Sequence, residues 1–283
     1  MEINKVSVIG GGTMGNGIAH VFALKDFNVN LIEMDNELAD KALAVIAKNL
    51  DRQIKKGLIS EEDKKRAISK INKIAGVENI PPDSDLIIEA IYENKEAKLS
   101  IFNQLQSLVK SESIFASNTS SISITELSAL NRPDKFIGMH FMNPVPVMKL
   151  VEIIRGYSTS DNTFNTIKEL ALKLDKVPVE VFDYPGFISN RILMPMINEA
   201  VFALMEGVAS AEDIDTVMKL GMNHPMGPLT LADFIGLDVC LAIMEVLYNG
   251  FNDPKYRPCP LLKKMVAAKK LGRKNGEGFF KYQ

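Results

Sequence analysis

Three glycines close to the N-terminus have the spacing of a dinucleotide-binding turn. Gly10, Gly12 and Gly15 form the pattern G-x-G-x-x-G, after a short β-rich run (residues 5–9) and at the start of a helical pattern (residues 12–24). In such a turn the first glycine permits a tight bend, the second lets the backbone approach a pyrophosphate, and the third lets helix and strand pack closely. The pattern therefore predicts a dinucleotide site, and a glycine-rich loop without a ligand is the alternative.

An acidic residue after the next strand indicates which dinucleotide would bind. Thr13 and Met14 open the helix, whose N-terminal end would meet the phosphate charge. Glu33 follows a second β-rich run, residues 28–32, and lies 23 residues after Gly10. A carboxylate at this place can bind both hydroxyls of the adenosine ribose, and it would repel a 2′-phosphate. We therefore expect NAD rather than NADP.

A histidine and a glutamate are expected to face each other across a hairpin. Two strand-like runs, residues 136–140 and 149–154, flank a connection that is too short for a helical crossover, so they are expected to be antiparallel. A hairpin centred on Pro146 pairs His140 with Glu152. Such a pair suits proton transfer, because the carboxylate orients the imidazole and stabilises the imidazolium. A buried structural hydrogen bond is the alternative.

Two other polar segments could serve a site or only the fold. Residues 117–121, Ser-Asn-Thr-Ser-Ser, follow a strand-like run, and ligands of open parallel sheets bind at such strand ends. These residue types also favour helix N-caps, and taken alone they favour a cap before Ile122. Asn190, near a predicted helix start, could orient a substrate or join two domains. His224 is interpreted as a turn residue.

The elements that must position these residues alternate between strand and helix patterns, which is typical of a mostly parallel sheet covered on both faces. Two helical patterns, residues 36–56 and a second one starting at Ser60, predict a helical hairpin whose outer side is rich in lysine. A proline and a glycine at residues 185–186 indicate a boundary, and helical patterns follow it. We expect a Rossmann-type α/β domain with a helical hairpin insertion over residues 1–184 and an all-helical domain over residues 185–283. The expected strands are residues 5–9, 28–32, 85–90, 113–117, 136–140, 149–154 and 177–181, and the later helices are residues 187–206, 211–220, 228–248 and 260–270.

Composition excludes several classes of function. The net charge is −2 over 283 residues, so there is no basic field to attract nucleic acid or an anionic membrane surface. No apolar run approaches the roughly 18 residues of a membrane span. No charged leader precedes the first strand, so we expect a cytoplasmic protein. Cys240 and Cys259 make no disulfide framework, and the histidines are too far apart in sequence to suggest a metal site.

Four segments together resemble the 3-hydroxyacyl-CoA dehydrogenase family, in particular its stand-alone bacterial 3-hydroxybutyryl-CoA dehydrogenases, over essentially the whole chain. They are residues 116–121 (ASNTSS), 138–154, 185–191 (PGFISNR) and 224–228 (HPMGP). The resemblance implies NAD-dependent oxidation of an L-3-hydroxyacyl-CoA to the 3-oxoacyl-CoA, and the reverse reduction of acetoacetyl-CoA.

The same resemblance implies roles for individual residues. His140 would be the general base and Glu152 its partner, while Ser120 and Asn190 would position the 3-oxygen of the substrate. For Ser120 this replaces the interpretation as a helix cap.

Further contacts follow from the resemblance. Glu93, Lys98, Asn143 and Lys274 would contact the cofactor, and Lys56 in the hairpin would help to hold coenzyme A. The C-terminal domain would form a homodimer. Two alternatives stay open: a dehydrogenase of a small hydroxy or sugar acid that does not use coenzyme A, and a non-catalytic NAD(H)-binding protein.

Overall fold

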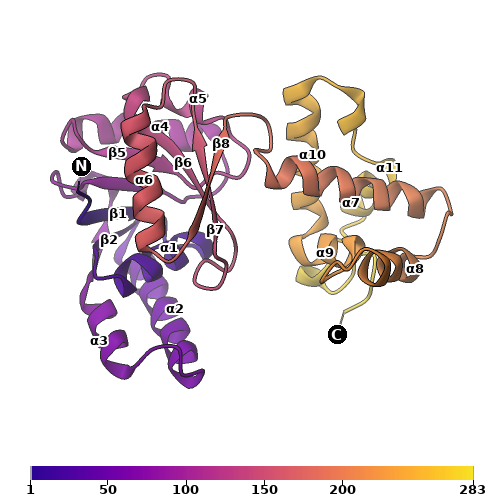
Figure 1. Ribbon diagram of the computed structural model, residues 1–283, viewed down its shortest axis with the longest axis horizontal. Helices are drawn as coiled ribbons and strands as arrows, with labels where there is room; N and C mark the ends of the chain where they lie inside the picture. Colours follow the sequence, from indigo (N-terminus) through magenta and orange to yellow (C-terminus); the bar gives the residue numbers. More distant parts are fainter. Residues whose placement is uncertain (1, 283) are drawn as a thin grey trace. The chain divides into compact units, whose positions relative to one another are not determined.

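The computed structural model describes residues 2–282, which divide into two units between Asp183 and Tyr184. The first unit is an α/β domain in which helices cover the sheet, and the second is built from helices (Figure 1). Within the described residues one sheet has eight strands in the order β3-β2-β1-β4-β5-β6-β7-β8. The strands are β1 (Lys5–Ile9), β2 (Asn28–Glu33), β3 (Ile71–Ala75), β4 (Leu86–Glu89), β5 (Ile114–Ser117), β6 (Phe136–Phe141), β7 (Leu150–Arg155) and β8 (Val177–Phe182).

Six of these strands, β1 to β6, run parallel to their neighbours, β7 is antiparallel to β6, and β8 is parallel to β7. Every residue of β4 and β5 is buried, as expected for strands with helices on both faces. The helices of this unit are α1 (Thr13–Leu24), α2 (Asn36–Lys55), α3 (Glu61–Ser69), α4 (Lys95–Leu108), α5 (Ile124–Ser128) and α6 (Asp161–Lys173). The predicted Rossmann-type sheet is confirmed.

The strand β3 is absent from the sequence-based expectation. Its sequence Ile-Asn-Lys-Ile-Ala has polar residues at its second and third positions, and both are exposed. It lies at the edge of the sheet and pairs only with β2. Edge strands tolerate such polar residues. Strand β3 therefore forms by pairing with β2 and lacks the apolar pattern by which a buried strand is recognised in a sequence.

The predicted helical hairpin is formed by α2 and α3. Asp35 caps α2 by accepting a hydrogen bond from the Leu38 amide at 2.8 Å. Ser60 and Asp63 form a reciprocal capping box at the start of α3. These local caps stabilise a hairpin that carries exposed lysines, including Lys56 directly after α2.

The second unit contains α7 (Ser189–Met205), α8 (Ala211–Thr216), α9 (Pro228–Ile235), α10 (Leu237–Phe251) and α11 (Pro260–Ala267). The single helix expected over residues 228–248 is wrong. Gly236, with φ +106°, separates α9 from α10, and this backbone conformation is rare for residues with a side chain. None of the helices within residues 2–282 has the length and apolar character that a membrane span needs.

Candidate active site

Two glycines of the turn between β1 and α1 lie where no side chain fits. Gly10 has φ +91°, and a Cβ atom there would lie 2.8 Å from the carbonyl oxygen of Ala90. A Cβ atom on Gly15 would lie 1.7 Å from the carbonyl oxygen of Gly10. Because both residues lack a side chain, the backbone can pack this closely and α1 can begin directly after the end of β1, as the glycine pattern predicts.

The space in front of this turn fits a pyrophosphate. A Cβ atom on Gly12 would meet no atom within 4 Å, so the protein leaves the approach to its backbone open. Among the described side chains none caps α1, and the first turn has no acidic residue. The backbone N–H groups of that turn, with the helix dipole, are therefore the donors that phosphate oxygens would meet.

Glu33, the last residue of β2, borders the turn. Its carboxylate accepts hydrogen bonds from the backbone N–H groups of Gly11 and of Met34. It lines a cavity of about 640 Å³ at the carboxyl ends of β1, β2 and β4, and a second one of about 420 Å³ between the glycine turn, α2 and residues 143–146.

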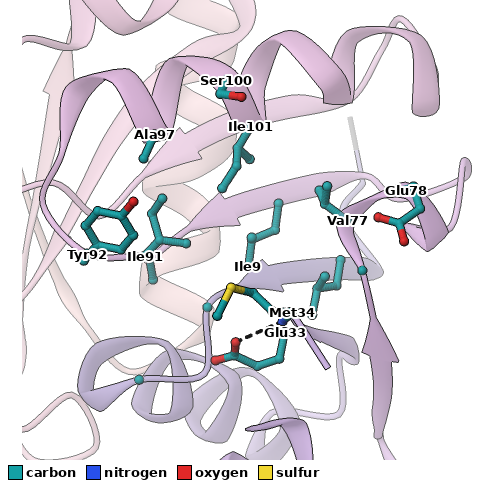
Figure 2. A pocket seen from close by; sticks show the side chains of 15 residues that line it. Ile9, Glu33, Met34, Val77, Glu78, Ile91, Tyr92, Ala97, Ser100 and Ile101 are labelled. Carbon is teal, nitrogen blue, oxygen red and sulfur yellow. Dashed lines mark hydrogen bonds between the residues drawn. The ribbon is translucent and has the colours of Figure 1, made fainter. Parts of the chain in front are cut away.

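The larger cavity suits the adenosine part of NAD. Figure 2 shows apolar side chains around it, with α4 on one side and the Glu33 carboxylate on the other. Apolar walls with one carboxylate match a flat base attached to a ribose that donates hydrogen bonds. The labelled residues around it are Ile9, Glu33, Met34, Val77, Glu78, Ile91, Tyr92, Ala97, Ser100 and Ile101.

The predicted register of the β6–β7 hairpin is confirmed, and it pairs His140 with Glu152. The Nδ1 atom of His140 lies 2.7 Å from Oε2 of Glu152, and both residues are buried, with exposed fractions of 7% and 2%. A carboxylate only accepts, so Nδ1 carries the hydrogen of this bond. This arrangement orients the imidazole, and its use in catalysis stays a prediction.

Asn118 also supports this histidine, and the sequence analysis did not single it out. Its Oδ1 atom accepts a hydrogen bond of 3.0 Å from the amide of Phe141, the residue after His140. The backbone N–H group of Asn118 donates to the carbonyl oxygen of Glu89 at 2.8 Å. Asn118 thus ties the end of β5 to both neighbouring strands, and its position in the Ser-Asn-Thr-Ser-Ser segment was the available signal.

The helix-cap interpretation of residues 117–121 is wrong. The cap of α5 is Ser123, whose hydroxyl accepts from the Glu126 amide at 3.2 Å. The segment before it forms a loop instead, and the Ser120 amide donates to Oε1 of Glu93 at 2.9 Å. Ser120 therefore belongs to a loop at the carboxyl end of β5, next to β6, and two strands, β1 and β4, lie between β5 and the strand that ends at Glu33.

The remaining predicted residues are spread over both units. Lys98 is buried on α4, and Asn143 is exposed in the β6–β7 connection. Asn190 is buried on α7 of the second unit, and Lys274 of that unit forms an ion pair with Asp238. The first unit thus brings together three groups: the turn with Glu33, the His140–Glu152 pair, and the loop of Ser120 with Glu93 and Lys98.

Comparisons with known proteins show the family of the chain. Residues 5–184 match the family described as 3-hydroxyacyl-CoA dehydrogenase, NAD binding domain, and residues 186–282 match the 3-hydroxyacyl-CoA dehydrogenase, C-terminal domain. A probable 3-hydroxybutyryl-CoA dehydrogenase from Deinococcus radiodurans is 56% identical over 98% of this chain and 100% of its own length. The 3-hydroxybutyryl-CoA dehydrogenase of Clostridioides difficile is 52% identical over 98% of this chain and 99% of its own.

A solved structure is similar over the same extent. The crystal structure of (S)-3-hydroxybutyryl-CoA dehydrogenase from Ralstonia eutropha is 50% identical and covers 100% of both chains with a TM-score of 0.97. Both domains match models of one family, and two relatives are more than 50% identical over nearly the whole chain. The chain belongs to the 3-hydroxyacyl-CoA dehydrogenase family and is an NAD-dependent dehydrogenase.

Proposed function

We propose that this protein oxidises L-3-hydroxybutyryl-CoA to acetoacetyl-CoA with NAD and catalyses the reverse reduction. The observation that carries the proposal is the buried His140–Glu152 pair, with its 2.7 Å hydrogen bond, near the carboxyl end of β6. Strands β1 and β6 point the same way, so this pair and the glycine turn lie at the same edge of one sheet. The names of the relatives above half identity support the four-carbon substrate.

In this proposal the protein contributes one base and the groups that orient the substrate. The Nε2 atom of His140 takes the proton of the 3-hydroxyl group, while the Glu152 carboxylate stabilises the resulting imidazolium at Nδ1. Ser120 and Asn190 orient the 3-oxygen, as the resemblance implies. NAD, when bound, supplies the acceptor for the hydride of C3, and Gly12, Glu33, Asn143 and Lys274 are among the residues proposed to hold it.

The proposal is tested by adding acetoacetyl-CoA and NADH to the purified protein and following NADH absorbance. We expect turnover with NADH that exceeds turnover with NADPH, and oxidation of the L but not the D isomer of 3-hydroxybutyryl-CoA. Free acetoacetate and small hydroxy or sugar acids serve as the matched substrates without coenzyme A. Faster turnover of one of these would favour the first alternative, and NADH binding without turnover of any substrate would favour a non-catalytic protein.

The exposed lysine of the hairpin gives a second test of the coenzyme A assignment. Replacing Lys56 by alanine is expected to raise the KM for acetoacetyl-CoA while kcat stays the same, because the side chain would contact the phosphates far from the reacting carbon. One exposed charge pair contributes up to about 1 kcal/mol, which is about fivefold in KM. The control is Lys173→Ala, which removes an exposed lysine of α6. An acetoacetyl thioester without the nucleotide part of coenzyme A should have the same KM with Lys56→Ala and with the parent. If the two proteins also had the same KM for acetoacetyl-CoA, the coenzyme A assignment of Lys56 would be contradicted.

We also propose that the second unit forms a homodimer in a cytoplasmic enzyme. Several large apolar side chains of this unit are exposed, and such side chains are typical of subunit interfaces. They include Val208, Val217, Leu220 and Met222.

A further inference from the structure

A buried ion pair lies beneath the loop that carries Ser120. Glu89, the last residue of β4, is fully buried, and Lys98 of α4 is exposed by only 1%. The Nζ atom of Lys98 lies 2.6 Å from Oε1 of Glu89. Two charges this deep are uncommon, because leaving water costs each of them free energy that only well-placed partners offset.

Glu89 uses its remaining hydrogen-bonding capacity on its neighbours. Its Oε1 atom also accepts from the Ile91 amide at 2.7 Å, and Oε2 accepts from the Ser117 hydroxyl at 2.6 Å. Burial raises the pKa of Glu89 above its usual value, although Lys98 and Ser117 act to lower it. The pair is therefore anchored to the ends of both β4 and β5.

Lys98 also contacts a second carboxylate, and that carboxylate holds the loop. Its Nζ atom lies 3.3 Å from Oε2 of Glu93. The other oxygen, Oε1 of Glu93, accepts from the Thr119 hydroxyl at 2.5 Å and from the Ser120 amide at 2.9 Å. It also accepts from the amide and the hydroxyl of Ser121, each at 3.1 Å. One carboxylate oxygen thus holds three consecutive residues.

The charges explain why this carboxylate is suited to hold the loop. The Glu93 side chain is 39% exposed, and its partial burial acts to raise its pKa. The Lys98 charge and the hydrogen bonds from Thr119 and Ser120 outweigh this effect, so the pKa of Glu93 lies below its usual value. Glu93 is therefore ionised and accepts from all of these donors at once. Without Lys98, two carboxylates would face each other with no cation between them.

We propose that Lys98 is a positioning residue: together with Glu89 it holds the Glu93 carboxylate, which places Ser120 for the substrate. This inference rests on the proposed function, in which Ser120 orients the 3-oxygen. A positioning role for Lys98 differs from the direct cofactor contact that the resemblance implies. The ammonium group of Lys98 already contacts the carboxylates of Glu89 and Glu93, and the side chain is almost unexposed. Glu89 and Thr119 become part of the same positioning network.

A double-mutant cycle between Lys98→Met and Ser120→Ala tests this inference. We expect Lys98→Met to lower kcat about 100-fold, a loss that a misplacement of about 1 Å can cause. The dissociation constant for NADH, measured by fluorescence, should rise far less than kcat falls, although Glu93 is also one of the expected cofactor contacts. If Lys98 acts through Ser120, the double variant should be no slower than the slower single variant.

A matched control is Lys110→Met. Lys110 forms a comparable bond of 2.5 Å to Asp85, but at the opposite end of β4, so its loss should leave kcat unchanged. If Lys98→Met does not fold, Thr119→Val replaces it in the cycle, because it breaks the network from the loop side without leaving a buried charge unpaired.

The possible outcomes separate this inference from the proposed function. Losses in kcat that multiply in the double variant, or an NADH dissociation constant that rises in step with the loss of kcat, would overturn the positioning role while Ser120 keeps its own. Full activity of Ser120→Ala would instead remove the proposed role of Ser120, and this inference with it. If Ser120→Ala is slow and the losses in the double-mutant cycle are not additive, the results support both the role of Ser120 and the positioning role of Lys98.

Discussion

Replacing His140 by glutamine is expected to lower kcat for acetoacetyl-CoA reduction by about 10²–10⁴-fold, the usual contribution of a general acid–base group. The physical reason is that an amide cannot take up and return a proton near neutral pH, although it is close in size to imidazole. In the parent, the Nδ1 atom of His140 donates a hydrogen bond of 2.7 Å to the Glu152 carboxylate, which orients the imidazole for this proton transfer. The measurement is steady-state NADH absorbance at saturating substrate.

Two further measurements show whether this loss concerns chemistry. The dissociation constant for NADH should not change, because His140 lies on β6 and the glycine turn follows β1. The matched control is His224→Gln, which changes a histidine outside every regular helix of the second unit and should retain the parent kcat. A His140→Gln variant that turns over nearly as fast as the parent would contradict the role of base.

Replacing Gly12 by alanine is expected to weaken NADH binding strongly while the protein stays folded. Gly12 has φ −61° and ψ −164°, which an alanine can adopt, and its Cβ atom would meet no protein atom within 4 Å. The added methyl group would instead occupy the approach of the pyrophosphate. Overpacking of this kind costs about 1–3 kcal/mol, or about 5- to 150-fold in the dissociation constant. NADH fluorescence titration measures it.

The contrasting variant is Gly15→Ala in the same turn. Its Cβ atom would lie 1.7 Å from a backbone oxygen, so the turn itself must shift. We expect a loss of stability above about 4 kcal/mol, which lowers Tm by about 10 °C or more. Gly12→Ala should lose at most about 1 kcal/mol, the effect of a changed helix cap. Equal Tm values for both variants, or unchanged NADH binding by Gly12→Ala, would contradict this account of the turn.

The sequence by itself determined those features in which the interacting residues are close along the chain. The glycine turn is recognisable because each glycine answers a local steric requirement of a strand–turn–helix unit. The pairing of His140 with Glu152 follows from the geometry of one hairpin, where the register depends only on the position of the turn. The capping box of Ser60 and Asp63 is also local.

Only the tertiary structure decided how distant parts of the chain meet. Strand β3 exists because β2 pairs with it, and its own residues carry no strong apolar pattern. Lys98 looks like an ordinary lysine of an amphipathic helix, since lysine is rarely buried and its burial cannot be read from its type. Its partners Glu89 and Glu93 accept hydrogen bonds from residues 28 positions further along the chain, at the end of β5 and in the loop after it. The residues proposed for the reaction were therefore visible in the sequence, whereas the buried charges proposed to hold Ser120 in place appear only when the packed sheet brings its strand ends together.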